Sequence, residues 1–427
     1  MNRRKHVAGF VAFFGVFIFL SLNWHSHSPK FTYHGEIWAD RAGYHVYLPA
    51  AFDYGFDPEA FPAGIAQRTG NGFELDSIPG RVTTKYPCGE ALLRIPFYLI
   101  GKLLRDADDP LGAGFTLIDH AMVDVAASFY GTLGLFLLFL VLKRREGGRA
   151  AALAAFCILM GTNLFYYLVG DPGMSHVYSF FLFAAFIHVL DKASWGALAR
   201  PKAFLLGVIA GLILVTRPTN ILFLPLAMAI TAPPSAGVVA WVRNVMKPHY
   251  VLPMAAGVLL LCLPQMAYWQ YAFGTPVKWS YGHEGFTRLA DPPLLHFWFS
   301  PYNGLFPYSP LIAIILLLGT LHWRKMAIPI TVPWITLFAV SYLSASWHAW
   351  TFGCGFGARN LVEYTVVFAF PLAALFGKRN PRRMVAYALA AACCMYTFKL
   401  TYSYPTCWFG DVWDWPRFAN LLFGPFL

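Results

Sequence analysis

Long apolar stretches alternate with short polar segments along most of the chain. A helix needs about 20 apolar residues to cross a bilayer, and roughly eleven stretches approach that length. We therefore predict about eleven transmembrane helices. They are placed at residues 7–24, 119–142, 150–168, 175–191, 203–216, 219–232, 250–272, 306–321, 327–345, 361–377 and 384–401. The stretches at 203–216 and 219–232 are shorter than a usual span, so we expect them to be tilted, broken or longer than drawn.

The composition agrees with this pattern. Hydrophobic residues make up 58% of the chain and charged residues only 12%, about half the charged share of a soluble domain. A soluble fold is therefore excluded, and the sequence predicts an all-α polytopic membrane protein with one transmembrane domain over residues 1–427. The first stretch follows basic residues and lacks a small-residue cleavage site after it, which predicts a retained signal anchor.

The basic residues lie in short clusters between the predicted helices, and all of these clusters fall on one side of the membrane. The clusters are Arg3/Arg4/Lys5, Lys143/Arg144/Arg145/Arg149, Lys192/Arg200/Lys202, Arg243/Lys247, Arg324/Lys325 and Lys378/Arg379/Arg382/Arg383. The positive-inside rule makes this side cytoplasmic, with the N-terminus. The net charge of +11 therefore reports topology, and no nucleic-acid partner is predicted.

The long segments fall on the opposite, outer side. They are a first loop at 25–118, a second loop at 273–305 and a short tail at 402–427. Residues 90–104 of the first loop are apolar, but a span there would reverse the side of every later loop. We therefore predict a juxtamembrane helix in the interface, with Arg94 and Lys102 reaching toward the headgroups.

Three of the seven cysteines, Cys88, Cys354 and Cys407, fall on the outer side. They allow at most one disulfide. Because a helical membrane protein has little need of covalent cross-links, the favoured interpretation is that these thiols are free or buried.

An acidic residue just beyond the first span is the first candidate for chemistry. Asp40 stands at the membrane interface, where an ionisable side chain is a functional candidate. It has the chemistry of a general base that accepts a proton from an attacking hydroxyl. Alternatively it pairs with Arg41 or caps the following helix, and the spacing does not choose between these roles.

Three basic residues on the outer side are candidate contacts for a phosphate. Lys85 precedes Pro87 and an apolar helix, whose first backbone N–H groups are available to an anion; ordinary contact with lipid headgroups is the alternative. Arg359 begins a predicted span, where its charge needs a phosphate or a carboxylate such as Glu363. Arg217 at a span end binds phosphate or extends to the headgroups.

The remaining candidates are substrate contacts. Aromatic residues suited to a sugar or a lipid, or else to the interfacial aromatic belt, are Tyr44, Trp347 and Trp350; polar ones are Asp171, His176 and His283. The last three can in principle bind a divalent cation, but their spacing fits no standard metal motif. No metal site is therefore predicted, and the sequence requires no cofactor.

The order of several motifs resembles bacterial glycosyltransferases of the C superfamily. These motifs are Tyr-x-x-Tyr-Leu-Pro after Asp40, Lys-Tyr-Pro at 85–87, Ser-His-x-Tyr-Ser-Phe-Phe at 175–181, Thr-Arg-Pro at 216–218, Gly-Leu-Phe-Pro-Tyr-Ser-Pro at 304–310 and Trp-x-x-Trp…Gly-x-Arg at 347–359. The resemblance covers nearly the whole chain. More narrowly, the chain is similar to the group that includes protein mannosyltransferases and aminoarabinose transferases.

This resemblance implies a transferase that takes a hexose or pentose from a polyprenyl-phosphate carrier on the non-cytoplasmic face. It implies that Asp40 is the catalytic acid of the first outer loop and that Lys85 lies near the carrier phosphate. The chain departs from the pattern at Arg41, where many members have Glu, and at His176, where the aminoarabinose branch has Asp.

The predicted function is thus an inverting glycosyltransferase of the bacterial inner membrane with a periplasmic active site. Its predicted partners are a polyprenyl-phosphate-linked sugar, membrane lipids and an acceptor that is a glycan, a lipid or a protein. Two alternatives remain: a transporter or flippase for a lipid-linked intermediate, and a non-catalytic binding subunit. No internal repeat of the transporter kind is evident.

Overall fold

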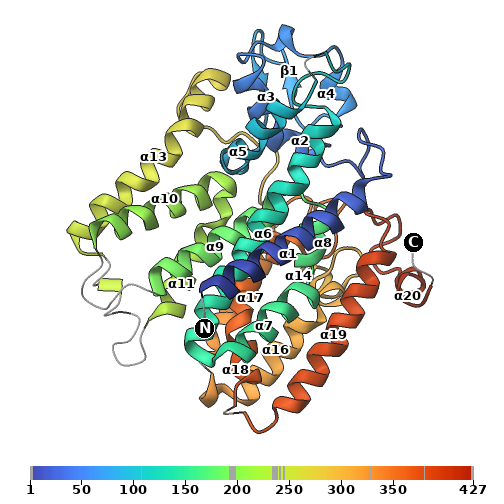
Figure 1. Cartoon of the computed structure of the whole chain (residues 1–427). Helices are drawn as coiled ribbons and strands as arrows, with labels where there is room; N and C mark the ends of the chain where they lie inside the picture. Colours follow the sequence, from blue (N-terminus) through green and yellow to red (C-terminus); the bar gives the residue numbers. More distant parts are fainter. Residues whose placement is uncertain are drawn as a thin grey trace.

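The computed structural model of the chain describes residues 3–106, 108–191, 199–232, 239, 242–243, 246–326, 328–378 and 380–424. It is a bundle of helices with a folded cap, formed by the first loop, at one end (Figure 1). The α-helices are α1 Arg3–His25, α2 Asp40–His45, α3 Tyr47–Phe52, α4 Ile65–Arg68, α5 Gly89–Leu104, α6 Leu117–Glu146, α7 Gly148–Met160, α8 Leu164–Val169, α9 Ser175–Asp191, α10 Arg200–Thr216, α11 Phe223–Thr231, α13 Pro248–Phe273, α14 Leu294–Phe299, α15 Leu305–Tyr308, α16 Pro310–Leu321, α17 Thr331–Ala345, α18 Thr365–Phe376, α19 Arg383–Ser403 and α20 Trp415–Phe423. The 3₁₀ helices are η1 Pro58–Ala60, η2 Pro218–Leu222, η3 Trp323–Lys325 and η4 Arg359–Leu361, and the strands are β1 Glu74–Leu75 and β2 Val82–Thr83.

Every predicted span contains a helix, so the all-α polytopic fold is confirmed. Among the described residues, four helices are long and apolar enough to cross a membrane: Val7–His25, Leu117–Glu146, Pro248–Phe273 and Arg383–Ser403. Six further apolar segments are shorter: Gly148–Met160, Ser175–Asp191, Pro218–Thr231, Pro310–Leu321, Thr331–Ala345 and Thr365–Phe376. The number of crossings, eleven, stays a prediction.

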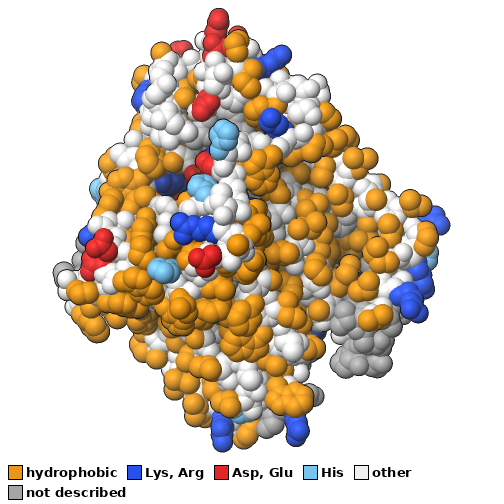
Figure 2. All heavy atoms as spheres, turned by 180° about the vertical axis from the view of Figure 1, so that it is seen from behind, with side chains coloured by type: hydrophobic (Ala, Val, Ile, Leu, Met, Phe, Trp, Pro, Cys, Tyr) orange, Lys and Arg blue, Asp and Glu red, His pale blue; other side chains and the backbone are white. Residues whose placement is uncertain are grey.

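The surface of the bundle is what a bilayer requires. Figure 2 shows a wide hydrophobic surface across one face, with charged and histidine side chains at its upper end, in a column that runs down into its upper left part, and at its lower and right edges. Apolar side chains exposed in this way are stable against lipid, and a soluble protein rarely exposes so large an apolar area.

Close helix packing depends on glycine at the contact between α10 and α13. A methyl group added to Gly207 would lie 2.0 Å from the carbonyl oxygen of Met254, and one added to Gly257 would lie 2.5 Å from that of Phe204. Small residues let two membrane helices approach until their backbones touch. This contact helps place the end of α10 that leads to Arg217.

The span predicted at 150–168 contains two helices rather than one. α7 ends at Met160 and α8 begins at Leu164. Asn163 lies between them, and its side-chain amide donates to the carbonyl groups of Phe356 and Ala358, at 3.3 and 3.4 Å. The break therefore supports the segment that leads into α18.

The first loop folds around its own core of Ile37, Phe61, Ile65, Phe73 and Phe115. The helix predicted at 90–104 is present as α5, and it packs against α6 and α10.

One prediction for α5 is wrong, because Arg94 is buried rather than extended to the headgroups. Its guanidinium lies 3.1 Å from the carboxylate of Glu90 and 2.7 Å from Nδ1 of His45. These partners inside the protein replace the headgroup contacts. Lys102 is exposed and lies 2.9 Å from Asp53; its contact with the headgroups stays a prediction.

The interpretation of the outer cysteines as unlinked thiols is corrected for two of them. Cys354 and Cys407 form a disulfide across 53 residues, and Cys88 is a buried free thiol. A pairing between such distant residues follows from the fold and is not readable from sequence spacing.

Candidate active site

A cavity of about 490 Å³ lies where the first loop, the second loop and the segment between α17 and α18 meet. The lining combines charged groups with an apolar wall. It is formed by Asp40, Tyr44, Lys85, Tyr86, Arg217, Pro218, Thr219, Asn220, Leu222, Trp279, Tyr281, Glu284, Phe286, Val340, Leu343, Ser344, Trp347, His348, Ala349, Phe352, Arg359, Asn360 and Tyr364. Six of the ten predicted site residues are therefore brought together.

Asp40 is the first residue of α2, and its carboxylate is held from two sides. The hydroxyl of Tyr86 donates to Oδ1 at 2.5 Å, and Nη2 of Arg359 donates to Oδ2 at 2.9 Å. The predicted alternative partner, Arg41, instead pairs with Asp171 at 2.9 Å. Burial opposes ionisation of Asp40, but the charge of Arg359 and the hydrogen bond from Tyr86 outweigh it and lower the pKa below its ordinary value. Asp40 is therefore an ionised carboxylate that faces the cavity.

Arg359 lies in η4, and its guanidinium has three kinds of neighbour. Besides Asp40, it contacts the carbonyl oxygen of Cys354 at 3.4 Å and lies over the ring of Phe352 at 5.6 Å. Its Nε atom is buried and has no hydrogen-bond partner among the described residues. Glu363, considered as its partner from the sequence, contacts a different arginine.

Arg217 is that arginine, at the junction of α10 and η2. Its Nε lies 3.3 Å from Glu363, and its Nη2 donates to Oδ1 of Asn360 at 2.7 Å. Glu363 is fully buried and also lies 2.9 Å from Nδ1 of His176. Glu363 and Asn360 therefore orient the guanidinium of Arg217 toward the cavity.

Lys85 pairs with Glu284 of the second loop. The Nζ to Oε1 distance is 2.5 Å, and both side chains are about one-third exposed, at 34% and 35%. The ammonium also lies 5.5 and 5.9 Å from the ring centres of Tyr86 and Tyr281. Ser280 of the same loop donates to the carbonyl oxygen of Lys85 at 2.7 Å, so the second loop is joined to this end of the cavity.

Aromatic rings form much of the remaining wall. Trp347 packs edge-on against Phe286 and Tyr281, with ring centres 5.0 and 5.7 Å apart. Tyr44 lies against Tyr86 at 4.7 Å. Flat apolar faces next to fixed charges suit a ligand that has both a ring or chain and an ionic group.

Four predicted substrate contacts lie outside the cavity lining. Asp171 pairs with Arg41, and His176 pairs with Glu363. Trp350 is buried against His296, and His283 is exposed. Their roles as substrate contacts stay predictions.

Among the lining residues that were not predicted, three hydrogen-bond or pair with predicted ones: Tyr86, Glu284 and Asn360. Tyr86 follows Lys85 directly, and Glu284 follows the chosen His283, so both stood in segments already singled out. Asn360 adjoins Arg359. At Glu284 the sequence reasoning chose the wrong neighbour, whereas at Tyr86 and Asn360 it chose one lining residue of a pair and missed the other.

The described residues contain one group of three histidine and acidic side chains with metal-ligand spacing: His25, Glu36 and Asp124, whose ligand atoms lie within 4.8 Å of one another. It lies outside the cavity lining. Glu36 already contacts Lys30 at 2.5 Å and His120 at 2.8 Å, and His25 lies 3.1 Å from Asp124. The charges of this group are thus paired within the protein.

Comparison of the fold with solved structures gives two informative neighbours. ArnT from Cupriavidus metallidurans, in a structure bound to undecaprenyl phosphate, aligns with a TM-score of 0.56 at 14% identity, over 94% of this chain and 65% of that one. The oligosaccharyltransferase AglB from Archaeoglobus fulgidus, in complex with an inhibitory peptide and a dolichol-phosphate, aligns with a TM-score of 0.50 at 11% identity, over 92% and 55%. The chain has the fold of C-superfamily glycosyltransferases. It spans less than two thirds of the length of either neighbour. No protein-family model and no curated protein matches it significantly.

Proposed function

We propose that this protein transfers a sugar, with inversion, from a polyprenyl-phosphate donor to an acceptor in the cavity described above. The observation that carries this proposal is the composition of the cavity. The carboxylate of Asp40 faces the same space as three cationic side chains, Lys85, Arg217 and Arg359, beside an apolar wall, and the lining carboxylate Glu284 is paired with Lys85. Such a set suits a donor with a phosphate, a sugar and a hydrocarbon chain.

In the proposed complex, the three cations hold the donor phosphate. Arginine binds phosphate oxygens through its planar N–H groups, and lysine acts as a point charge. The unpartnered Nε of Arg359 is a donor ready for such an oxygen. Fixed cations also stabilise the charge that develops on the phosphate as the sugar departs.

Asp40 acts as the general base. The acceptor oxygen attacks the anomeric carbon from the face opposite the phosphate, its proton passes to Asp40, and the bond from carbon to the phosphate oxygen breaks with both electrons leaving on polyprenyl phosphate. Arg359 couples phosphate binding to proton transfer, because its contact with the phosphate weakens its ion pair with Asp40. The pKa of Asp40 then rises toward its ordinary value, which makes it a better base.

The apolar wall receives the rest of the donor. Tyr44 and Trp347 shape the space for the sugar or the first part of the lipid, and Leu222, Val340 and Leu343 offer an apolar surface to the carrier chain. The fold is that of proteins whose solved complexes contain undecaprenyl phosphate and dolichol-phosphate. These ligands support a lipid phosphate as the donor leaving group here.

The proposed setting is the bacterial inner membrane, with the cavity on the periplasmic side and the N-terminus in the cytoplasm. The positive-inside distribution of the basic clusters supports this orientation. The acceptor is a glycan, a lipid or a protein.

The test is release of polyprenyl phosphate from a panel of synthetic polyprenyl-phosphate sugars by purified wild type and Asp40→Asn. Loss of a general base should lower kcat by about 100-fold or more. Binding of polyprenyl phosphate should persist in the variant, since Arg359 loses a competing carboxylate. Asp108→Asn, an exposed change in the first loop, is the matched control and should keep full activity.

Other outcomes would contradict the proposal. Equal activity of wild type and Asp40→Asn would remove the assigned base. Movement of the lipid-linked sugar between leaflets without release of polyprenyl phosphate would instead indicate a flippase.

A further inference from the structure

The segment from Ser346 to Tyr364 joins α17 to α18 and contains only the short 3₁₀ helix η4. Two of its residues, Gly353 and Gly357, have φ of +68°, and Phe352 has φ of +55°. Backbone in this region of φ is disfavoured for residues other than glycine and needs support from its surroundings. Arg359 depends on this segment, so the contacts that hold the segment also determine the position of the guanidinium.

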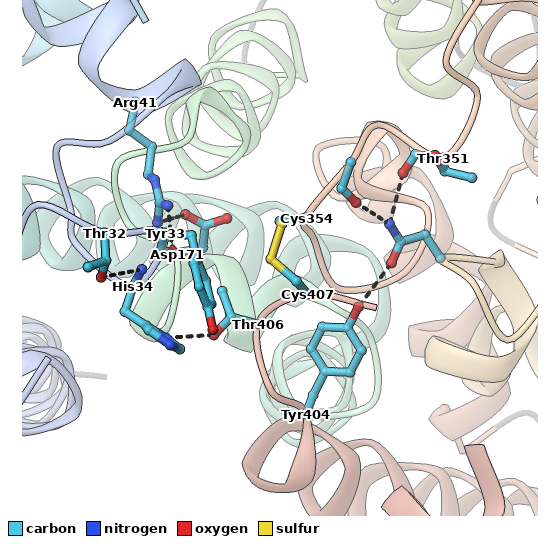
Figure 3. Close-up of a disulfide and its surroundings, with 12 residues drawn as sticks. Thr32, Tyr33, His34, Arg41, Asp171, Thr351, Cys354, Tyr404, Thr406 and Cys407 are labelled. Carbon is cyan, nitrogen blue, oxygen red and sulfur yellow. Dashed lines mark hydrogen bonds and ion pairs between the residues drawn. A yellow bond between two sulfur atoms is a disulfide. The ribbon is translucent and has the colours of Figure 1, made fainter. Parts of the chain in front are cut away.

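Two kinds of contact hold the first half of the segment. The side-chain amide of Asn303 donates to the carbonyl groups of Thr351 and Gly353, both at 2.8 Å. The disulfide then joins Cys354 to Cys407 of the tail. Figure 3 shows the disulfide between Cys354 and Cys407, together with Thr351 of the same segment.

The tail that carries Cys407 also contacts the first loop. Thr406 lies 3.2 Å from Nδ1 of His34, and the neighbouring carbonyl of Tyr33 accepts from Arg41 at 2.8 Å. Arg41 is fixed by its ion pair with Asp171, also drawn in Figure 3. Asp40 directly precedes Arg41.

The tail thus connects the two segments whose side chains form the Asp40–Arg359 pair. On one side it is bonded to Cys354, five residues before Arg359, and on the other it contacts the residues that precede Asp40. The guanidinium of Arg359 contacts the carbonyl of Cys354 and the ring of Phe352, so the disulfide-linked residue and its neighbour form part of the arginine's own environment.

We propose that the Cys354–Cys407 disulfide is a positioning element of the candidate active site, which holds Arg359 against Asp40 and thereby against the donor phosphate. This inference rests on the proposed function for its consequence in catalysis, but the geometry it predicts is measurable without a substrate. A disulfide restricts the conformations of the segments it joins. Without it, the glycine-rich segment samples positions in which Arg359 no longer covers the carboxylate.

Cys354 is exposed, so a small dithiol such as dithiothreitol can reach the bond. The dithiol supplies two electrons and two protons, which leaves two cysteine thiols and an oxidised dithiol. The bond therefore requires an oxidising compartment, in agreement with the proposed outer position of the cavity.

The experiment uses the full-length protein in lipid nanodiscs and begins with mass spectrometry of the alkylated, unreduced protein. A peptide pair joined through Cys354 and Cys407 is expected, and its absence would overturn the inference. The main readout is the rate at which a carbodiimide and an amine label the carboxylate of Asp40. In the double variant Cys354→Ser/Cys407→Ser this rate should rise by about tenfold, because a hydrogen-bonded arginine no longer shields the carboxylate. Cys262→Ser, which removes a free cysteine of α13, is the control and should leave the rate unchanged.

A second measurement separates positioning from general loosening of the fold. In Arg359→Gln the labelling of Asp40 should already be fast, and removal of the disulfide should add nothing further. The inference would be overturned if Arg359→Gln and loss of the disulfide increased the labelling rate of Asp40 additively. It would also be overturned if the double cysteine variant were labelled at the same rate as wild type.

Dissociation constants for polyprenyl phosphate complete the test. The double variant should bind it about tenfold more weakly than wild type, because a charged hydrogen bond to phosphate is lost. Dithiothreitol should weaken binding of polyprenyl phosphate by wild type to the same extent, and it should leave binding by the double variant unchanged. If loss of the disulfide speeds labelling of Asp40 but the wild type transfers no sugar, only the proposed function is contradicted. If sugar transfer and phosphate binding are unaffected by loss of the disulfide, only the positioning role is contradicted.

Discussion

Glu284 competes with the donor phosphate for Lys85 in the proposed reaction, and the effect of this competition on phosphate binding is measurable. The two side chains are 2.5 Å apart and each is about one-third exposed. Water and salt reach such a pair, so its net value is about 0.2–1 kcal/mol. At 25 °C this energy corresponds to a factor of about 1.4 to 5 in a dissociation constant. Glu284→Gln, which removes the charge and keeps the shape, should therefore tighten binding of polyprenyl phosphate by up to about fivefold.

The assay is titration of a polyprenyl phosphate into nanodiscs that contain wild type, Glu284→Gln or Lys85→Gln, at low and high salt. The gain in Glu284→Gln should shrink at high salt, since ions screen exposed charges, and Lys85→Gln should bind more weakly than wild type. Glu59→Gln removes an equal charge from an exposed position outside the cavity lining and is the control for a general electrostatic effect. Weaker binding by Glu284→Gln would refute the reasoning, because it would make Glu284 a contact that supports the ligand.

Two further predictions concern pH and packing. Burial raises the pKa of Asp40, but the charge of Arg359 helps to lower it below its ordinary value. Arg359→Gln should therefore raise this pKa and move the acid limb of the kcat/KM profile to higher pH. An acid limb that does not move would contradict the role of Asp40 as the base. Gly207→Ala places a methyl group 2.0 Å from the carbonyl oxygen of Met254 and should destabilise the protein by about 1–3 kcal/mol in thermal unfolding. Gly9→Ala, whose methyl group meets nothing within 4 Å, should leave stability unchanged, and equal stability of both variants would contradict the packing argument.

Hydrophobic run length was sufficient to predict the class of fold but not the interruptions within a span. Residues 150–168 form one apolar run, and nothing in its period distinguishes a continuous helix from two pieces. The break between α7 and α8 coincides with a tertiary contact, since Asn163 donates to the carbonyls of Phe356 and Ala358 almost 200 residues away. Contacts over such separations are not visible in a local pattern.

The same limit applies to ion pairs. Arg359 and Glu363 are four residues apart, a spacing that joins side chains on one face of a continuous α-helix. Here η4 ends at Leu361 and α18 begins only at Thr365, so the two side chains do not share a face. Arg359 pairs with Asp40, and Glu363 pairs with Arg217 and His176.

These pairings explain how the proposed phosphate site is stable before the donor binds. Three cations in a partly buried cavity would repel one another and lose hydration, a cost that partners of opposite charge reduce. Each cation has one: Asp40 for Arg359, Glu284 for Lys85 and Glu363 for Arg217.

The partners differ in how readily a phosphate can replace them. Glu363 is fully buried and shared with His176, so it remains with Arg217 and keeps that guanidinium oriented. Glu284 is one-third exposed on a loop, and its replacement costs little. Asp40 is also one-third exposed, and its release from Arg359 would raise its pKa. In the proposed reaction, replacement of Asp40 by the donor phosphate at Arg359 therefore also makes Asp40 a stronger base. In the proposed reaction, therefore, donor binding and activation of Asp40 are one event, and the pH profile of Arg359→Gln is its most direct measurement.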